Sequence, residues 1–340
     1  MTYAQTAPLG LSRSGFLPDR TVHLHPLDRC NLACSHCYSA SSPLLSAILP
    51  VDQMIAALPA LRAEGYRVIS LSGGEPMLYP GLAKLSDAAR AHGFGVVAIS
   101  NGFRITPNHP ALVASLDRVA ISFDGMKATH LAMRGHPRAW DAGIAALRHL
   151  VAIGKPAAAA FTVSTRSLPE VPEFIDLCAS LGVTSVQLRP LVLAGRAVQD
   201  AADMALGPAD LGRLWLMGQT LSLAYEGEVS VHTDLAPAQA LAADRGAWDC
   251  AQTGSGLLSD AVNPLVITPQ GVLRPFTYDF PEAFDLGHLR DLSGENLARL
   301  RARLPRIARL LTRTLDALAT EDGFVDWFAF QRDHAATEQV

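Results

Sequence analysis

Short apolar runs alternate with longer segments of helical periodicity through the first two thirds of the chain. Between the runs, apolar residues recur every three or four positions, as at Met54, Leu58 and Leu61. A short run of this kind is typical of a buried strand, and the longer spacing is typical of a helix packed by one face. The pattern predicts six strands separated by helices, at residues 22–27, 67–71, 95–99, 118–123, 157–163 and 184–188.

The order of these elements predicts the fold class. Repeated strand–helix units favour a parallel sheet with right-handed crossovers. We therefore expect an α/β fold, a partial (β/α)6 TIM-like barrel over residues 21–196. Residues 1–20 would form an N-terminal segment, and residues 197–340 a linker and a small C-terminal α+β cap. Within the cap region we expect helices at 208–225 and 296–318, the second kinked by Pro305.

Composition narrows the range of partners. The 340 residues are 49% hydrophobic, and 28 basic against 32 acidic side chains leave a net charge of −4. This is a globular composition without the basic surplus that nucleic-acid binding requires, so we expect no nucleic-acid partner. The uncharged stretch 30–51 contains many polar residues and does not suit a membrane span. The N-terminus lacks a signal-peptide pattern, and we expect a cytoplasmic protein with reduced thiols.

The distinctive polar residues all follow predicted strands. In parallel barrels the loops after the strands converge on one mouth, where the chemistry takes place. The predicted mouth therefore gathers a cysteine loop after the first strand, residues 72–76 after the second, 100–102 after the third, 122–125 after the fourth, 165–166 after the fifth, and Arg189 at the end of the sixth.

Three of the five cysteines lie within eight residues. Cys30, Cys34 and Cys37 have the spacing C-x3-C-x2-C. Three thiolates can hold three corners of a cubane [4Fe-4S] cluster and leave the fourth iron open. The alternative is structural zinc, which takes four tetrahedral ligands. His36 could supply the fourth only with difficulty because it is adjacent to Cys37. The spacing favours the cluster and leaves zinc open.

Over residues 22–196 the chain resembles the radical S-adenosylmethionine (SAM) superfamily. The three-cysteine loop matches that family's signature, and Ser72-Gly73-Gly74-Glu75-Pro76 matches its second motif. The resemblance implies one [4Fe-4S] cluster whose open iron binds SAM. It also implies an external one-electron reductant of the flavodoxin or ferredoxin type, and cleavage of SAM to a 5'-deoxyadenosyl radical that abstracts hydrogen from a substrate.

The resemblance also assigns SAM-binding roles. Gly73, Gly74 and Glu75 would contact the methionine moiety, and His36 and Tyr38 would lie near the adenine. A plain Gly-Gly turn and a solvated Arg134 are the alternatives without function. Further polar groups for the ribose and the methionine carboxylate are implied at Ser100, Asn101, Ser122, Asp124, Arg134 and Arg189.

Residues 250–287 resemble the SPASM or twitch extension of peptide-maturing members. Such extensions use further cysteines for auxiliary clusters, but Phe276 stands where a cysteine would follow Pro275, and only Cys250 remains. One thiolate cannot hold a cubane. We therefore predict no auxiliary cluster and a degenerate cap that closes the barrel mouth or frames the substrate.

The catalytic residues are not fixed by the sequence. Cys250, Asp234 and Tyr278 are weak candidates for donating hydrogen or steering a proton, and Cys250 is equally a packed small hydrophobe. Cys178 lies on an apolar stripe and is expected in the core. The arginine-rich segment 299–313 is typical of an amphipathic surface helix, and the alternative is a docking site for an acidic leader peptide, a partner protein or an electron donor.

Three functions remain open at this stage. The favoured one is radical chemistry on a ribosomally made peptide, a substrate class that rests on family likeness alone. The second applies the same chemistry to a small metabolite in cofactor or antibiotic biosynthesis. The third, from another class, is a non-catalytic scaffold in which the cysteines bind zinc.

Overall fold

Six parallel strands form the predicted partial barrel. The structure, a computed structural model, describes residues 20–243 and 256–337. Each strand pairs in parallel with the next along the chain. The fourth and fifth strands cover the residues that the apolar pattern predicted. The strands are β1 (Thr21–Leu24), β2 (Val68–Leu71), β3 (Gly95–Ser100), β4 (Arg118–Phe123), β5 (Ala157–Val163) and β6 (Ser185–Pro190).

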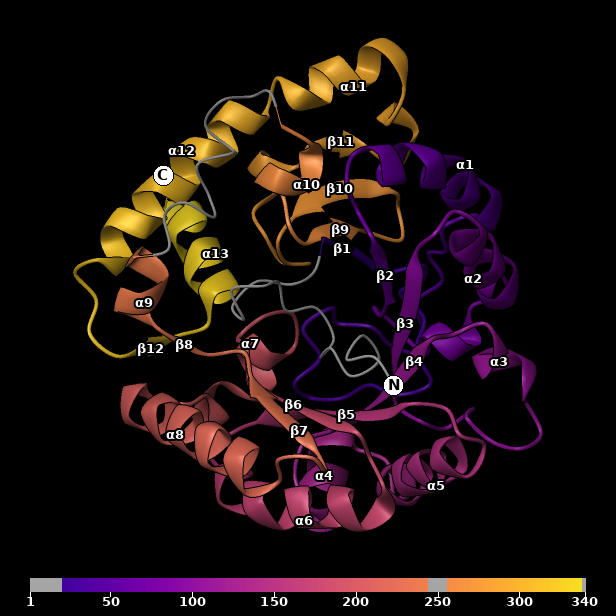
Figure 1. The fold of residues 1–340 in the computed structure, drawn as a ribbon, viewed down its shortest axis with the longest axis vertical. Helices are drawn as coiled ribbons and strands as arrows, with labels where there is room; N and C mark the ends of the chain where they lie inside the picture. Colours follow the sequence, from indigo (N-terminus) through magenta and orange to yellow (C-terminus); the bar gives the residue numbers. More distant parts are fainter. Residues whose placement is uncertain (1–19, 244–255, 338–340) are drawn as a thin grey trace.

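Helices cover the outside of this curved sheet (Figure 1). Two of them end just before Gly154 and Gly182, whose φ angles of 68° and 76° suit a glycine after a helix. The α/β partial barrel is therefore confirmed. The helices are α1 (Val51–Ala63), α2 (Leu82–Ala91), α3 (Ala111–Ala114), α4 (Lys127–Arg134), α5 (Ala139–Ala152) and α6 (Val171–Leu181).

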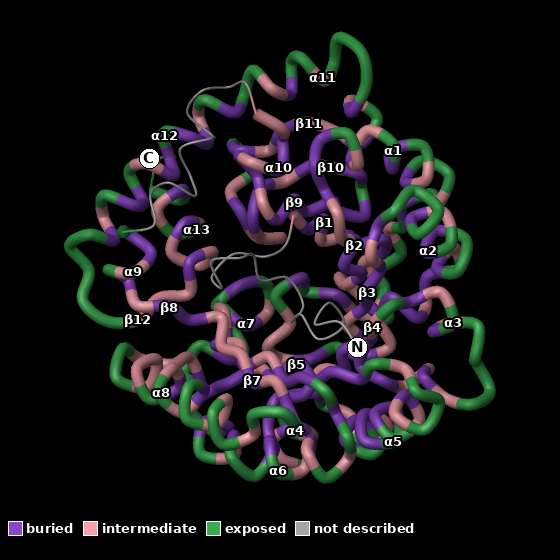
Figure 2. The backbone as a smooth tube through the Cα atoms, viewed as in Figure 1, coloured by how far each residue is buried: buried purple, intermediate pink, exposed green. Residues whose placement is uncertain are grey.

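The two faces of the strands carry side chains of different size. Val119, Ile121 and Phe123 of β4 belong to the main core beneath the helices. Because side chains alternate along a strand, Ala120 points to the opposite face, where it packs with Ala158 and Ala160 of β5 in a separate cluster. Because these side chains are small, they leave space for a ligand on the interior face of the barrel. Figure 2 shows the strands mostly buried and the outer helices exposed on one side.

The C-terminal region adds strands to both edges of the same sheet. β7 (Ser230–Thr233) pairs in parallel with β6, and β9 (Leu265–Ile267) pairs in parallel with β1. β10 (Val272–Pro275) and β11 (Gly287–His288) continue antiparallel from β9. The sheet therefore runs past residue 196, and the division of the chain there remains a prediction.

The prediction of one kinked helix at 296–318 is wrong, although the segment is helical. The segment forms two helices, α11 (Gly294–Arg301) and α12 (Leu304–Leu318). Pro305 lies in the first turn of α12, where its missing N–H has no partner to lose, so it starts a helix instead of kinking one. The expected linker likewise contains a short helix, α7 (Ala197–Asp200).

The remaining elements complete the cap. They are α8 (Pro208–Ala224), β8 (Ala236–Pro237), α9 (Ala238–Ala243), α10 (Leu258–Ala261), β12 (Phe324–Val325) and α13 (Trp327–Thr337). Short 3-10 helices occur at Pro76–Leu78, Leu168–Glu170, Ala202–Met204, Glu282–Phe284 and Leu289–Asp291. No helix in the part of the chain that the structure describes has the length and apolar character needed to cross a membrane.

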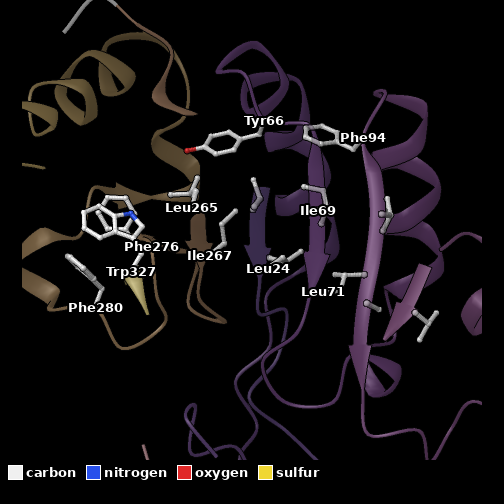
Figure 3. Close-up of a cluster of buried hydrophobic side chains, with 14 of the residues drawn as sticks. Leu24, Tyr66, Ile69, Leu71, Phe94, Leu265, Ile267, Phe276, Phe280 and Trp327 are labelled. Carbon is white, nitrogen blue, oxygen red and sulfur yellow. The ribbon is translucent and has the colours of Figure 1, made fainter. Parts of the chain in front are cut away.

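A buried seam joins the barrel to the cap. Figure 3 shows Tyr66, which precedes β2, with its hydroxyl directed at the cap. That hydroxyl donates to the carbonyl of Val262 at 2.7 Å. Nearby, the buried carboxylate of Glu64 accepts from Arg301 Nη2 at 2.6 Å and from the Leu258 amide at 2.9 Å. Three hydrogen bonds thus fix the cap against the first half of the barrel.

Replacing Tyr66 by Phe tests this seam. The side chain is fully buried, so Tyr66→Phe leaves the Val262 carbonyl without a donor. We expect the free energy of unfolding, measured with urea, to fall by about 1–3 kcal/mol. The control is Ser180→Ala, which removes an exposed hydroxyl bond, also of 2.7 Å, and should change the free energy by less than about 0.5 kcal/mol. Equal effects of the two variants would contradict the seam.

Candidate functional site

The three clustered cysteines lie on one loop between β1 and α1. Backbone bridges between Leu27 and Ile48 and between Arg29 and Ser42 close the base of the loop. Cys34 is buried, Cys30 and Cys37 are half-buried, and all three thiols are free. The loop therefore presents three sulfur ligands at the C-terminal end of the first barrel strand.

The arrangement of these thiols distinguishes between kinds of metal site. Within residues 20–243 and 256–337, no three His, Cys, Asp or Glu side chains converge on one ion position. A mononuclear zinc requires all ligands within about 2.3 Å of one point. In a cubane each cysteine binds a different iron, so the sulfurs need not converge. The donor set fits a cluster better than a single ion.

Burial keeps two of the thiols, those of Cys30 and Cys34, protonated until a metal binds. It raises the pKa of Cys30 to about 12 and that of Cys34 to about 11. Arg134 and Arg196 oppose the rise at Cys34 because a nearby cation favours the thiolate. Metal binding must therefore displace protons, and the two guanidiniums reduce that cost at Cys34.

Arg196 fastens the cysteine loop from 155 or more residues away in sequence. Its Nε donates to the carbonyl of Cys34 at 2.9 Å, its Nη1 to Ala40 at 2.8 Å, and its Nη2 to Ser41 at 2.7 Å. Its backbone amide donates to the carbonyl of Cys37 at 3.0 Å. The sequence analysis missed this residue. Its one local signal is the preceding Gly195, at which a Cβ would lie 2.4 Å from the Tyr38 carbonyl oxygen.

The second motif packs against the same loop. The amides of Gly74 and Glu75 donate to the carbonyls of Leu27 and Arg29, each at 3.0 Å. A Cβ on Gly74 would lie 2.2 Å from the Arg29 carbonyl oxygen. The close approach that requires glycine in the apoprotein is therefore to the base of the cysteine loop. Contact of Gly73 and Gly74 with SAM remains a prediction.

The Glu75 carboxylate is already bound to protein donors. Its Oε1 accepts from Ser100 Oγ at 2.8 Å and from the Met77 amide at 3.0 Å, and its Oε2 accepts from the Asn101 amide at 2.8 Å. Burial raises its pKa, although these hydrogen bonds favour the charged form. Each carboxylate oxygen accepts two bonds, so Oε2 keeps one acceptor position. Ser100, fully enclosed, supports Glu75 instead of facing the lumen.

Asn101 reaches the cysteine loop directly. Its Nδ2 donates to Asn31 Oδ1 at 2.8 Å and lies 3.8 Å from the sulfur of Cys30. Ser122 alternates with Ala120 along β4 and so lies on the lumen face of that strand. Of the polar groups predicted after β3 and β4, one thus contacts a cysteine ligand and one lines the lumen.

A buried ion pair ties β4 to α4 and to the cysteine loop. Arg134 donates to the fully buried Asp124 through Nε at 2.5 Å and Nη2 at 3.2 Å. His36 Nε2 lies 3.0 Å from Oδ1, the oxygen that also accepts from Arg134 Nη2. Burial works against ionisation of Asp124, but Arg134 and then His36 hold its pKa well below the usual range. The contact with Asp124 fixes the orientation of the His36 ring through Nε2. Binding of SAM by Arg134 remains a prediction.

His130 completes this buried group as a neutral ring. Its Nδ1 accepts the Asp124 amide hydrogen at 3.2 Å, so that nitrogen carries no proton. Burial lowers its pKa to about 4. The 3.5 Å approach to the Asp124 carboxylate is therefore not an ion pair at neutral pH.

Aromatic rings from barrel and cap meet at the mouth. The His25 ring stacks on Tyr278 with centroids 4.5 Å apart, and Tyr38 meets both rings edge-on at 5.8 and 6.1 Å. Burial lowers the pKa of His25 to about 3. The Nδ1 atoms of His25 and His36 are buried without a protein partner in the described parts of the chain. Tyr278, a weak catalytic candidate, thus lies beside the cysteine loop.

On the opposite side of the mouth, Asp234 anchors two barrel residues. Arg189 Nε and Gln187 Nε2 each donate to its carboxylate at 2.6 Å. The Arg189 side chain is 44% exposed. Arg189, predicted to face SAM, and Asp234, a weak catalytic candidate, therefore form one pair at the ends of β6 and β7.

Other predicted residues have mixed outcomes. Cys250 lies outside the described residues, so its role stays a prediction, and so does the absence of an auxiliary cluster. Phe276 is buried against Phe280 and Phe328, and Cys178 is fully buried. In the arginine-rich segment, Arg301 binds Glu64, while Arg303 and Arg306 donate to the carbonyls of Asp285 and Ala283. These bonds favour the structural interpretation of that segment.

Comparison with known proteins shows what this chain is similar to. Residues 24–178 match the radical SAM superfamily. Pre-heme d1 synthase from Dinoroseobacter shibae is 32% identical over 180 residues, 52% of this chain and 45% of that protein. The sporulation killing factor maturation protein SkfB from Bacillus subtilis is 30% identical over 196 residues, 56% of this chain and 48% of that protein. The chain spans about half the length of the curated relatives it matches.

A solved structure extends the likeness to the cap. Native anSMEcpe, with bound AdoMet and Cp18Cys peptide, has a TM-score of 0.61 at 14% identity, covering 94% of this chain and 97% of that chain. At this identity the likeness concerns the fold alone. It includes the C-terminal region as well as the barrel.

Replacing Arg196 by Gln tests the loop clamp. The variant loses the charge and most of the bonds to Cys34, Ala40 and Ser41, so we expect local opening of residues 30–42 to become easier by about 2 kcal/mol. Hydrogen exchange of these amides measures this, and iron content after anaerobic reconstitution should fall several-fold. The control is Arg166→Gln, which removes an exposed arginine 3.6 Å from Asp203. Unchanged exchange in Arg196→Gln would refute the clamp.

His130 predicts a pH dependence of stability. The pKa of His130 in the folded protein, about 4, lies below the ordinary histidine value of 6.5. As the pH falls, the unfolded chain therefore binds a proton at this residue before the folded protein does. The stabilisation is complete above pH 6.5 and is lost as the pH falls to 4, by about 3 kcal/mol. His130→Asn keeps an acceptor for the Asp124 amide and should flatten urea stability between pH 7 and 4 by that amount. His92→Asn, at an exposed position, is the control, and an equal slope in both variants would contradict the assignment.

Proposed function

We propose that this chain, whose residues 24–178 match the radical SAM superfamily, is a radical SAM enzyme acting on a ribosomally made peptide. The observation that carries the proposal is the clamped loop with Cys30, Cys34 and Cys37 at the barrel mouth. A [4Fe-4S] cluster held there would bind SAM at its open iron and, on reduction, supply a 5'-deoxyadenosyl radical for hydrogen abstraction.

The chain's own residues prepare this site in three ways. Arg196 and the amides of Gly74 and Glu75 hold the loop rigid, which lowers the entropy cost of metal binding. The small side chains of Ala120, Ala158 and Ala160 leave space in the lumen for a nucleoside. Tyr278 and the rings stacked beside it cover the mouth from the cap side, and this excludes water from a reactive centre.

We infer a one-electron reductant of the flavodoxin or ferredoxin type and a cytoplasmic setting. Cysteines that must stay reduced to bind iron suit a reducing compartment. Both inferences follow from the cofactor chemistry, because the domain itself contributes only one electron-accepting cluster site through Cys30, Cys34 and Cys37.

The peptide substrate is supported by the maturation protein SkfB among the relatives and by anSMEcpe, a fold neighbour solved with a bound peptide. The second candidate is a small metabolite of cofactor biosynthesis. Its support is the likeness to a pre-heme d1 synthase at similar identity. Mass spectrometry separates the two. A loss of two hydrogens from a candidate peptide incubated with reduced protein and SAM supports the first, and conversion of a tetrapyrrole supports the second.

Replacing Cys34 by Ala tests the ligand assignment. After anaerobic reconstitution the wild-type chain should hold about four irons, the content of one cubane. Cys34→Ala should lose the iron–sulfur absorbance and form no 5'-deoxyadenosine from SAM after reduction. Cys178→Ala, in the core of α6, is the matched control and should keep both. Retained SAM cleavage in Cys34→Ala would contradict the assignment, and a colourless, fully folded zinc protein would end the radical proposal.

A further inference from the structure

A cavity of about 490 Å³ opens between the segment that follows β6 and the C-terminal elements. One wall comes from residues 190–193 and 205–211, and the other from β12 and the start of α13. Most of the lining is apolar, including Leu191, Leu206, Leu211, Phe324, Val325 and Phe330. Because β6 ends at Pro190, the cavity lies directly beside the barrel mouth. Its volume is that of a typical ligand pocket.

One carboxylate in this lining has no cationic partner. Asp326 Oδ1 accepts the amides of Phe328 and Ala329 at 3.0 and 3.1 Å and so caps α13. Within residues 20–243 and 256–337, Asp326 forms no ion pair, and its Oδ2 has no hydrogen-bond donor. Burial and the nearby Asp234 raise its pKa to about 6, although Arg189 favours the charged form. The carboxylate is therefore largely ionised at neutral pH without a bound counter-charge.

The neighbouring cations are already committed. Arg189 donates through Nε to Asp234 at 2.6 Å. Arg332, on the cavity wall, lies 2.8 Å from both Asp279 and Asp333. Two guanidiniums thus face four carboxylates, including Asp326. The surplus charge beside an apolar cavity is negative, and an anionic ligand would be repelled while a cation would be attracted.

We propose that this cavity binds a basic side chain of the substrate, with its aliphatic stem against the leucine and phenylalanine wall and its ammonium or guanidinium head on Asp326 Oδ2. The proposal rests on the proposed function in taking the occupant to be a substrate peptide, and it narrows that class to peptides carrying lysine or arginine near the reacting residue. Binding there would fix the peptide beside the mouth through an interaction that is remote from the reacting carbon.

Two small probes test the site directly on the reconstituted full-length protein. Nα-acetyl-L-lysine amide and Nα-acetyl-L-norleucine amide share stem and backbone and differ in the charged head. Saturation-transfer NMR titration should show the lysine probe binding about tenfold more tightly. Asp326→Asn keeps the helix cap but removes the charge, and it should abolish the preference. Asp322→Asn, an exposed acid four residues earlier, is the matched control and should keep it.

A second variant guards against a folding defect in the first. Ala205 lies in the cavity wall, and Ala205→Phe should fill the space and weaken both probes. Equal binding of the two probes to the wild type, or an unchanged preference in Asp326→Asn, would overturn the proposal. Formation of 5'-deoxyadenosine without substrate is measured in parallel. Its absence from the wild type counts against the proposed function, whereas lost lysine preference with intact SAM cleavage counts against this site alone.

Discussion

The binding of one guanidinium to the carbonyls of the cysteine loop is the interaction on which the rest of this site depends. A loop with three thiols cannot rely on regular secondary structure, because its sulfurs must point to separate corners of a ligand. Arg196 replaces the missing ladder by donating to Cys34, Ala40 and Ser41, and the glycine motif supports the loop from its other side. The backbone is thereby fixed while the side chains stay available.

Buried charge is the second organising feature. Asp124 is fully enclosed, and an isolated carboxylate there would be strongly unfavourable. It is tolerated because Arg134 binds both of its oxygens and His36 also approaches Oδ1. Asp124, Arg134 and His36 thus connect the end of β4, the helix α4 and the cysteine loop. A displacement of one of these elements would therefore strain its contacts with the other two. A similar logic joins Asp234 to Arg189 and Gln187 across the mouth.

The cap contributes to the site through an apolar core that positions its side chains at the mouth. Where related extensions would place a cysteine, Phe276 packs with Phe280 and Phe328 in an apolar core. That core is joined to the barrel through β9 and Tyr66 (Figure 3). It carries Tyr278 to the mouth and sets Asp326 beside the end of β6. The cap is therefore built into the sheet at both edges and supplies walls and charge to the cavity.

The sequence by itself determined the strands, the parallel order, the cysteine loop and the concentration of polar residues at one mouth, because periodicity and strand-end position are local properties. Only the tertiary structure decided which groups meet. It paired Arg134 with Asp124, turned Ser100 toward Glu75, and brought Arg196 to a loop more than 150 residues away. It also placed Pro305 in the first turn of α12, where the missing N–H of proline costs no helical hydrogen bond because α11 has already ended. Such contacts depend on chain crossings and burial, and a linear pattern does not encode the distance between residues remote in sequence.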